Sequence, residues 1–124
     1  SQTNDERASA AEINLAGRRR MLSQRIGLLA SQLQQNPRPE DIADLEHSTW
    51  EMADIHRTLL DGTPDRRIRP LPESLRTAFD APDGPHAKIA HFLNLANSLQ
   101  TLPTDSEAFR TTLEEVVSLG RAMC

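Results

Sequence analysis

The positions of the prolines constrain the fold of this chain more than any other feature. All eight prolines lie outside or at the start of four long segments, residues 6–35, 39–60, 85–101 and 104–123. Inside a helix, proline removes a backbone donor and clashes with the preceding turn, but it is tolerated at the first helical position. The four long segments are therefore predicted to be uninterrupted helices, and the chain is predicted to be all-α.

The spacing of the apolar residues supports this prediction, because each segment carries one apolar stripe at helical periodicity. The stripes are Leu15, Leu22, Ile26, Leu29 and Leu33; Ile42, Leu45, Met52 and Leu59, with Thr49 and His56 at the remaining steps; Ile89, Phe92, Ala96 and Leu99; and Phe109, Leu113, Val116, Gly120 and Met123. Trp50 neighbours the second stripe and is expected to pack there. Four helices with one inward stripe each predict an antiparallel four-helix bundle, with both chain ends on the same side.

The connections between the helices follow from the turn residues. Residues 61–84 hold four prolines and two glycines, which predict a long Pro-rich loop between the second and third long helices, with room for one short helix around residues 73–79. The last helix opens with Thr104-Asp-Ser-Glu107, a capping-box pattern. The first helix is expected to begin near Glu6.

Composition excludes several classes of function. The formal net charge of −4 argues against a nucleic-acid-binding module, and Cys124 is the only cysteine, so the chain has no CxxC zinc site and no haem attachment motif. The four histidines lack metal-ligand spacing, and no nucleophile–base arrangement is visible. We expect residues 1–124 to be one domain without metal, cofactor or enzymatic activity. No apolar run approaches the roughly 20 residues that span a bilayer.

The first helix carries a second face opposite its apolar stripe. At about 100° per residue, this face holds Ile13, Gly17, Arg20, Gln24, Gly27 and Ser31. Each helical glycine costs about 1 kcal/mol relative to alanine, and small residues on one stripe allow another helix to approach closely. The arc is therefore a candidate helix–helix contact.

Arg20 on this face needs an anionic partner if the contact forms, because a buried unpaired charge is costly. If a second copy of the helix packs here about a two-fold axis, the two Arg20 guanidiniums face each other, and an oxyanion between them would relieve their repulsion. Periodicity alone leaves a simpler reading open, in which residues 18–20 form a solvated basic cluster and Gly17 is incidental.

Residues 13–25, Ile-Asn-Leu-Ala-Gly-Arg-Arg-Arg-Met-Leu-Ser-Gln-Arg, resemble the signature segment of PilJ-type sensor domains. Those domains are the ligand-binding regions of type IV pilus methyl-accepting chemotaxis transducers and related chemoreceptors. The segment is also similar to the first-helix motif of the NarX/NarQ nitrate sensor kinases. The pattern is long and specific but covers only about a tenth of the chain.

The resemblance implies a periplasmic helical sensor domain that is part of a transmembrane receptor and acts as a homodimer. It implies that nitrate lies at the dimer interface, gripped by Arg20 of both subunits, with Gly17 leaving room for it. Gln24 and Ile13 share that face, and Met21 joins the candidate ligand-binding residues as part of the motif, although it lies off the arc. Arg18 and Arg19 also lie off the arc and are expected to be peripheral.

Other functions remain open at this point. The chain could instead be a structural dimerisation or protein-interaction domain, in which Arg20 pairs with an acid of a partner protein. It could also be the sensor domain of a nitrate or nitrite histidine kinase. Nitrite is a second candidate ligand, because two arginines could hold either small oxyanion.

Overall fold

The computed structural model describes residues 8–123, and within this range the chain forms five helices and no strands. The helices are α2 (Ala10–Gln35), α3 (Pro39–Asp61), α4 (Glu73–Phe79), α5 (Pro85–Leu99) and α6 (Glu107–Met123). The all-α prediction is confirmed. The short helix expected in the Pro-rich segment is also present, as α4.

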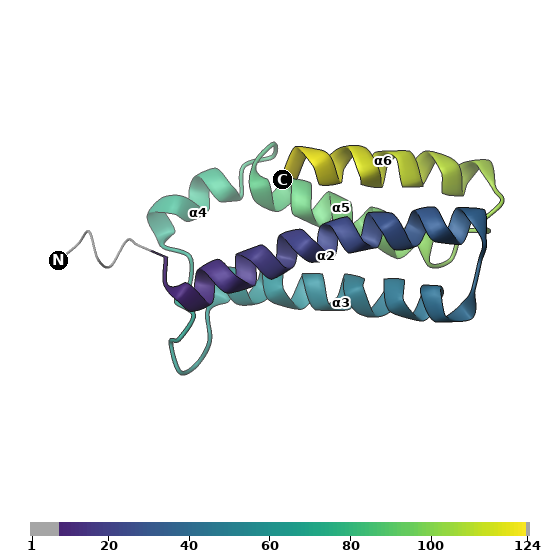
Figure 1. The fold of residues 1–124 in the computed structure, drawn as a ribbon. Helices are drawn as coiled ribbons and strands as arrows, with labels where there is room; N and C mark the ends of the chain where they lie inside the picture. The colour runs from purple at the N-terminus through teal and green to yellow at the C-terminus, as the bar shows by residue number, and fades with distance from the viewer. Residues whose placement is uncertain (1–7, 124) are drawn as a thin grey trace.

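The four long helices lie side by side, and each one contacts two of the others. α2 packs against α3 and α6, and α5 packs against α3 and α6 (Figure 1). The beginning of α2 and the end of α6 point toward the same end of the molecule (Figure 1). That end also carries α4 and the segment that leads into it.

Most members of the predicted apolar stripes form the core, and Ala30 and Ile55 join them. Its buried members come from all four long helices and are Leu22, Ile26, Leu29, Ala30, Leu33, Leu45, Met52, Ile55, Ile89, Phe92, Ala96, Leu99, Phe109, Leu113 and Val116. The side chains of this cluster are aliphatic except for Met52 and two phenylalanines. Such a core suits helices, whose long unbranched and γ-branched side chains interdigitate well.

Two predicted packing residues of α3 do not join the core. Ile42 is 38% exposed and Trp50 is 65% exposed. In the first turn of α3, Asp41 takes the buried position, where it accepts hydrogen bonds of 2.9 and 3.0 Å from the Arg38 guanidinium. Trp50 follows the buried Thr49, and the rotation of about 100° between successive residues takes the indole to the surface.

Two helix starts also differ from the sequence-based predictions. α2 begins at Ala10, where Ser9 and Glu12 form a capping box; the predicted start near Glu6 lies outside the described residues. α6 is capped by Ser106, whose hydroxyl oxygen accepts the Phe109 N–H at 3.1 Å, and not by Thr104. Both caps satisfy backbone donors that the first turn of a helix leaves unpaired.

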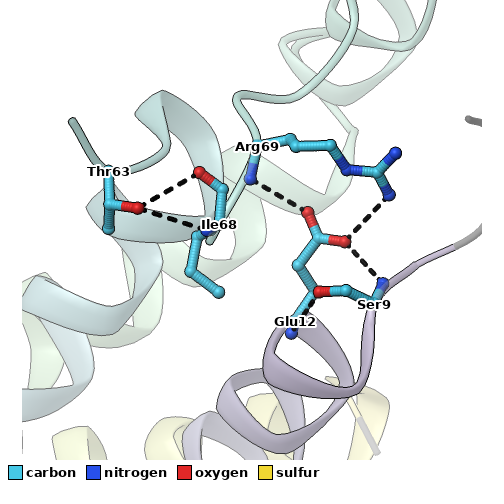
Figure 2. A network of polar contacts seen from close by, with 5 residues as sticks. All are labelled: Ser9, Glu12, Thr63, Ile68 and Arg69. Carbon is cyan, nitrogen blue, oxygen red and sulfur yellow. Dashed lines mark hydrogen bonds and ion pairs between the residues drawn. The ribbon is translucent and has the colours of Figure 1, made fainter. Parts of the chain in front are cut away.

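Glu12 also ties α2 to the Pro-rich segment (Figure 2). One carboxylate oxygen accepts the Ser9 N–H at 2.6 Å and the Arg69 guanidinium at 3.1 Å, and the other accepts the Arg69 backbone N–H at 3.2 Å. These hydrogen bonds, with that from Ser9 the largest cause, lower the pKa of Glu12 to about 2. A single half-buried carboxylate thus joins two segments that are far apart in sequence.

The turn at Gly62 brings the rest of the Pro-rich segment back across the end of α3. Gly62 has a φ of 75°, and a Cβ there would lie 2.7 Å from the Pro70 nitrogen. Glycine is needed because it alone combines this backbone conformation with such close approach. The Leu71 N–H then donates to the Leu60 carbonyl at 2.9 Å, which places α4 over the start of α2.

We predict that Glu12→Ala lowers the free energy of unfolding by about 1.5–3 kcal/mol, because it removes hydrogen bonds to a charged group. Ser9→Ala should cost only about 1 kcal/mol, as expected for an N-cap alone. Urea denaturation at pH 7 followed by circular dichroism measures both values. Glu46→Ala, at an exposed glutamate of α3, is the control. Equal stability of the Glu12 and Glu46 variants would contradict the assigned role.

Candidate functional site

Three of the five predicted ligand-binding residues line one cavity. Ile13, Gly17 and Arg20 border a hollow of about 280 Å³ between α2 and the other long helices. The other lining residues come from all four long helices and are Ala16, Arg19, Ser23, Met52, Ile89 and Met123. The face predicted from helical periodicity therefore borders a concave surface within one chain.

The other two predicted residues lie outside this cavity. Gln24 is exposed and lines a neighbouring groove of about 510 Å³ between α2 and α6, together with Gly27 and Ser31. Met21 is 41% exposed and borders neither hollow. The structure thus divides the predicted face into a cavity that contains Arg20 and a groove that contains Gln24.

The cavity of Arg20 is lined by two positive charges and no negative one. Arg19 and Arg20 both border it, and none of its lining residues is acidic. Among residues 8–123, no acid forms an ion pair with the Arg20 guanidinium, whereas Arg18 pairs with Glu51 at 2.9 Å and Arg25 with Asp44 at 3.7 Å. This charge distribution favours a small anion, because an anion would supply the missing negative charge.

The space around Gly17 is open. A Cβ added at Gly17 or at Gly27 would meet no atom within 4 Å. Packing among residues 8–123 therefore gives no reason for glycine at either position. Three large apolar side chains of the same helix are exposed as well, namely Ile13, Met21 and Leu28, at 59%, 41% and 67%.

Arg19 is not peripheral, and that prediction is wrong. It borders the cavity of Arg20, and its Nη1 lies 3.0 Å from Nδ1 of His56, a buried residue of α3. Nε2 of His56 in turn lies 2.9 Å from Nδ1 of His86 at the start of α5. Burial lowers the pKa of the Arg19 guanidinium. α2 turns Arg19 toward α3, so the side chain crosses the helix–helix contact.

Sequence analysis did not predict the contacts among Arg19, His56 and His86, because these residues are far apart in the sequence. Ring contacts complete it: the His56 ring lies 5.1 Å from that of His86 and 5.9 Å from that of Phe79, between ring centroids. Burial, then the positive charge of Arg19, then His86 lower the pKa of His56 to about 4. His56 is therefore neutral at pH 7. The only sequence signal was the appearance of a histidine on a mostly apolar stripe.

The described residues were also compared with the requirements of a metal site and of a membrane-spanning helix. No group of three or more His, Cys, Asp or Glu residues within the described range is arranged to hold a metal ion. No helix between residues 8 and 123 is long and apolar enough to cross a bilayer.

We predict that the buried neutral state of His56 makes the fold less stable in mild acid. Native His56 stays neutral down to about pH 4, whereas an unfolded imidazole takes up its proton near pH 6.5, so the unfolded chain binds more protons between these values. The free energy of unfolding should fall by about 1–2 kcal/mol from pH 7 to pH 5. Urea denaturation at each pH measures this slope.

His56→Gln should flatten the slope, since it removes the titrating group and leaves an acceptor for Arg19. His91→Gln, at an exposed histidine of α5, should leave it unchanged. An identical pH dependence in the wild-type chain and in His56→Gln would show that His56 does not cause it.

Comparison with known proteins gives one match. The family described as PilJ, type IV pili methyl-accepting chemotaxis transducer N-term, matches residues 2–83, which is more than half of the chain. No curated protein and no solved structure matches this chain. The matched range includes α2, α3 and α4, and with them all five candidate ligand-binding residues. On this match the chain belongs to the PilJ family of chemotaxis transducer N-terminal domains.

Proposed function

We propose that this chain is the periplasmic sensor domain of a transmembrane chemotaxis transducer, and that it binds nitrate between the α2 helices of a homodimer. The observation that carries the proposal is the cavity of Arg20, which is lined by two arginines and by no acid. The family match supports a sensor role without catalysis and favours a chemotaxis transducer over a histidine kinase. Nitrite fits the same charge distribution and is the second candidate ligand.

The proposed dimer is supported by the free surface of α2. Gly17 and Gly27 leave room for a second helix, and Ile13, Met21 and Leu28 are apolar side chains that a partner helix would cover. A two-fold axis along this face would bring the two Arg20 guanidiniums together. A planar oxyanion between them matches the planar forks of two arginines.

Signal transfer in this proposal uses the antiparallel four-helix bundle that α2, α3, α5 and α6 would form. Without ligand, the two Arg20 side chains repel and disfavour the closed dimer. Nitrate binds the closed dimer better, and a ligand shifts an equilibrium only by such a difference in affinity. The resulting displacement of α2, on the order of 1–2 Å, would reach the ends of α2 and α6 that point to the same side of the molecule.

We predict that Arg20→Ala abolishes nitrate binding and leaves the chain folded. The side chain is exposed and lies opposite the core stripe, so its loss removes the charge that binds the anion and no core contact. Isothermal titration calorimetry with nitrate measures the affinity, and circular dichroism the fold. Arg25→Ala is the control, because it removes an exposed arginine of the same helix that borders neither hollow. This variant should bind nitrate as the wild type does. Unchanged affinity in Arg20→Ala would refute the site.

We further predict that nitrate promotes dimerisation and that bulk at Gly17 prevents it. Gly17→Ala should stabilise the isolated chain by about 1 kcal/mol through helix propensity, since a Cβ meets nothing there. Gly17→Leu should remain helical but lose nitrate-dependent dimerisation, with the alanine variant intermediate. Sedimentation velocity with and without nitrate reports the association state.

A wild-type chain that stays monomeric at saturating nitrate would refute the shared site. Binding of one nitrate per chain with no dependence on protein concentration would instead assign the anion to Arg19 and Arg20 of a single subunit. Indifference to nitrate and nitrite in a thermal-shift assay would favour the interaction-domain alternative, because a ligand that binds only the native state must raise its stability.

A further inference from the structure

A second, larger cavity lies at the end of the molecule where α2 begins and α3 ends. It has a volume of about 600 Å³, within the range of small-molecule sites. Its walls are the first turns of α2, the last turn of α3, residues 66–72 of the Pro-rich segment, and α4. It shares only Ala16 and Arg19 with the lining of the Arg20 cavity.

Most of the wall is apolar. The apolar lining residues are Ala8, Ala16, Leu59, Leu60, Pro70, Leu71, Pro72, Leu75 and Phe79. Leu75 and Phe79 come from α4, a helix in which no residue is buried, and Leu75 is 56% exposed. α4 therefore presents apolar side chains to a hollow that no other side chain of residues 8–123 fills.

The charges in this cavity are mainly positive. Four charged residues line it, and two of them, Glu12 and Arg69, neutralise each other through the ion pair of 3.1 Å (Figure 2). Arg19 has a hydrogen bond to His56, but a neutral imidazole supplies no negative charge. Among residues 8–123, no acid forms an ion pair with Arg66.

Arg66 is also the one residue other than glycine with a positive φ among the residues described, at 60°. Such a conformation is uncommon for arginine and persists only where the surrounding structure holds it. The backbone is held by hydrogen bonds from the Arg66 N–H to the Thr63 carbonyl, at 2.9 Å, and from the Arg67 N–H to the Asp65 carboxylate, at 3.0 Å. This turn places Arg66, and not Arg67, on the cavity wall.

We propose that this cavity is a second ligand-binding site, and that it takes an organic monocarboxylate with an apolar body. The apolar body contacts the leucines and Phe79, and the carboxylate lies toward Arg66 and Arg19, the two lining cations that no acid of residues 8–123 pairs with. Guanidinium groups bind carboxylates through paired hydrogen bonds. Nitrate has no apolar part and gains nothing from this wall, so the two cavities select different anions. The site does not depend on the proposed nitrate function.

Calorimetry on the 124-residue chain with 4-phenylbutyrate as the probe tests the proposal. The acid should bind at least tenfold more tightly than 4-phenylbutanamide, which keeps the apolar body and lacks the charge. Arg66→Asn should weaken phenylbutyrate binding at least tenfold, and asparagine tolerates the left-handed backbone conformation. Arg67→Asn, at the neighbouring exposed arginine, is the matched control and should bind as the wild type does.

Two further variants separate this site from the cavity of Arg20. Leu75→Ser should weaken phenylbutyrate binding through the loss of apolar contact and leave nitrate binding unchanged. Arg20→Ala should leave phenylbutyrate binding unchanged. The proposal is wrong if millimolar phenylbutyrate does not bind, if acid and amide bind equally, or if Arg66→Asn and Arg67→Asn behave alike. It is also wrong if Arg20→Ala abolishes phenylbutyrate binding, since the probe would then occupy the other cavity.

Discussion

The burial of one face of α2 is the constraint on which the rest of the structure depends. Leu22, Ile26 and Leu33 are at most 1% exposed, and full burial of each such side chain contributes about 1.5–3 kcal/mol. These contacts fix the rotation of α2 about its own axis. With that rotation fixed, Gly17 and Arg20 lie away from the buried stripe, at the edge of a cavity that Met52 and Ile89 line from within.

Arg19 connects the two cavities and gives the two proposals a common physical basis. Its side chain is half-buried and has only a neutral histidine as a hydrogen-bonding partner, so its charge is not compensated within the described part of the chain. A charge taken out of water without a counter-charge is unfavourable. An anion in either cavity would supply that counter-charge, since Arg19 borders both.

Most of the helical architecture could be predicted because helix formation and amphipathicity are local properties. Prolines and apolar spacing located the four long helices, and the boundaries differed by a few residues. The errors arose where a polar contact overrode the pattern: Ser9 and Glu12 set the start of α2, Ser106 caps α6, and Asp41 displaces Ile42 from the interior. More than one nearby side chain could cap each helix or occupy the buried position, and the helical repeat does not show which one will do so.

The sequence by itself determined which face of α2 enters the core and therefore which residues oppose it, because both follow from the helical repeat of one segment. Only the tertiary structure decided what those residues face. Glu12 meets Arg69 across 57 positions of sequence, and His56 meets His86 across 30. The larger cavity likewise depends on how the turn at Gly62 returns the chain across α3, and the cavity of Arg20 on how α3, α5 and α6 lie against α2. Such contacts require the relative placement of several segments, and no local pattern encodes that placement.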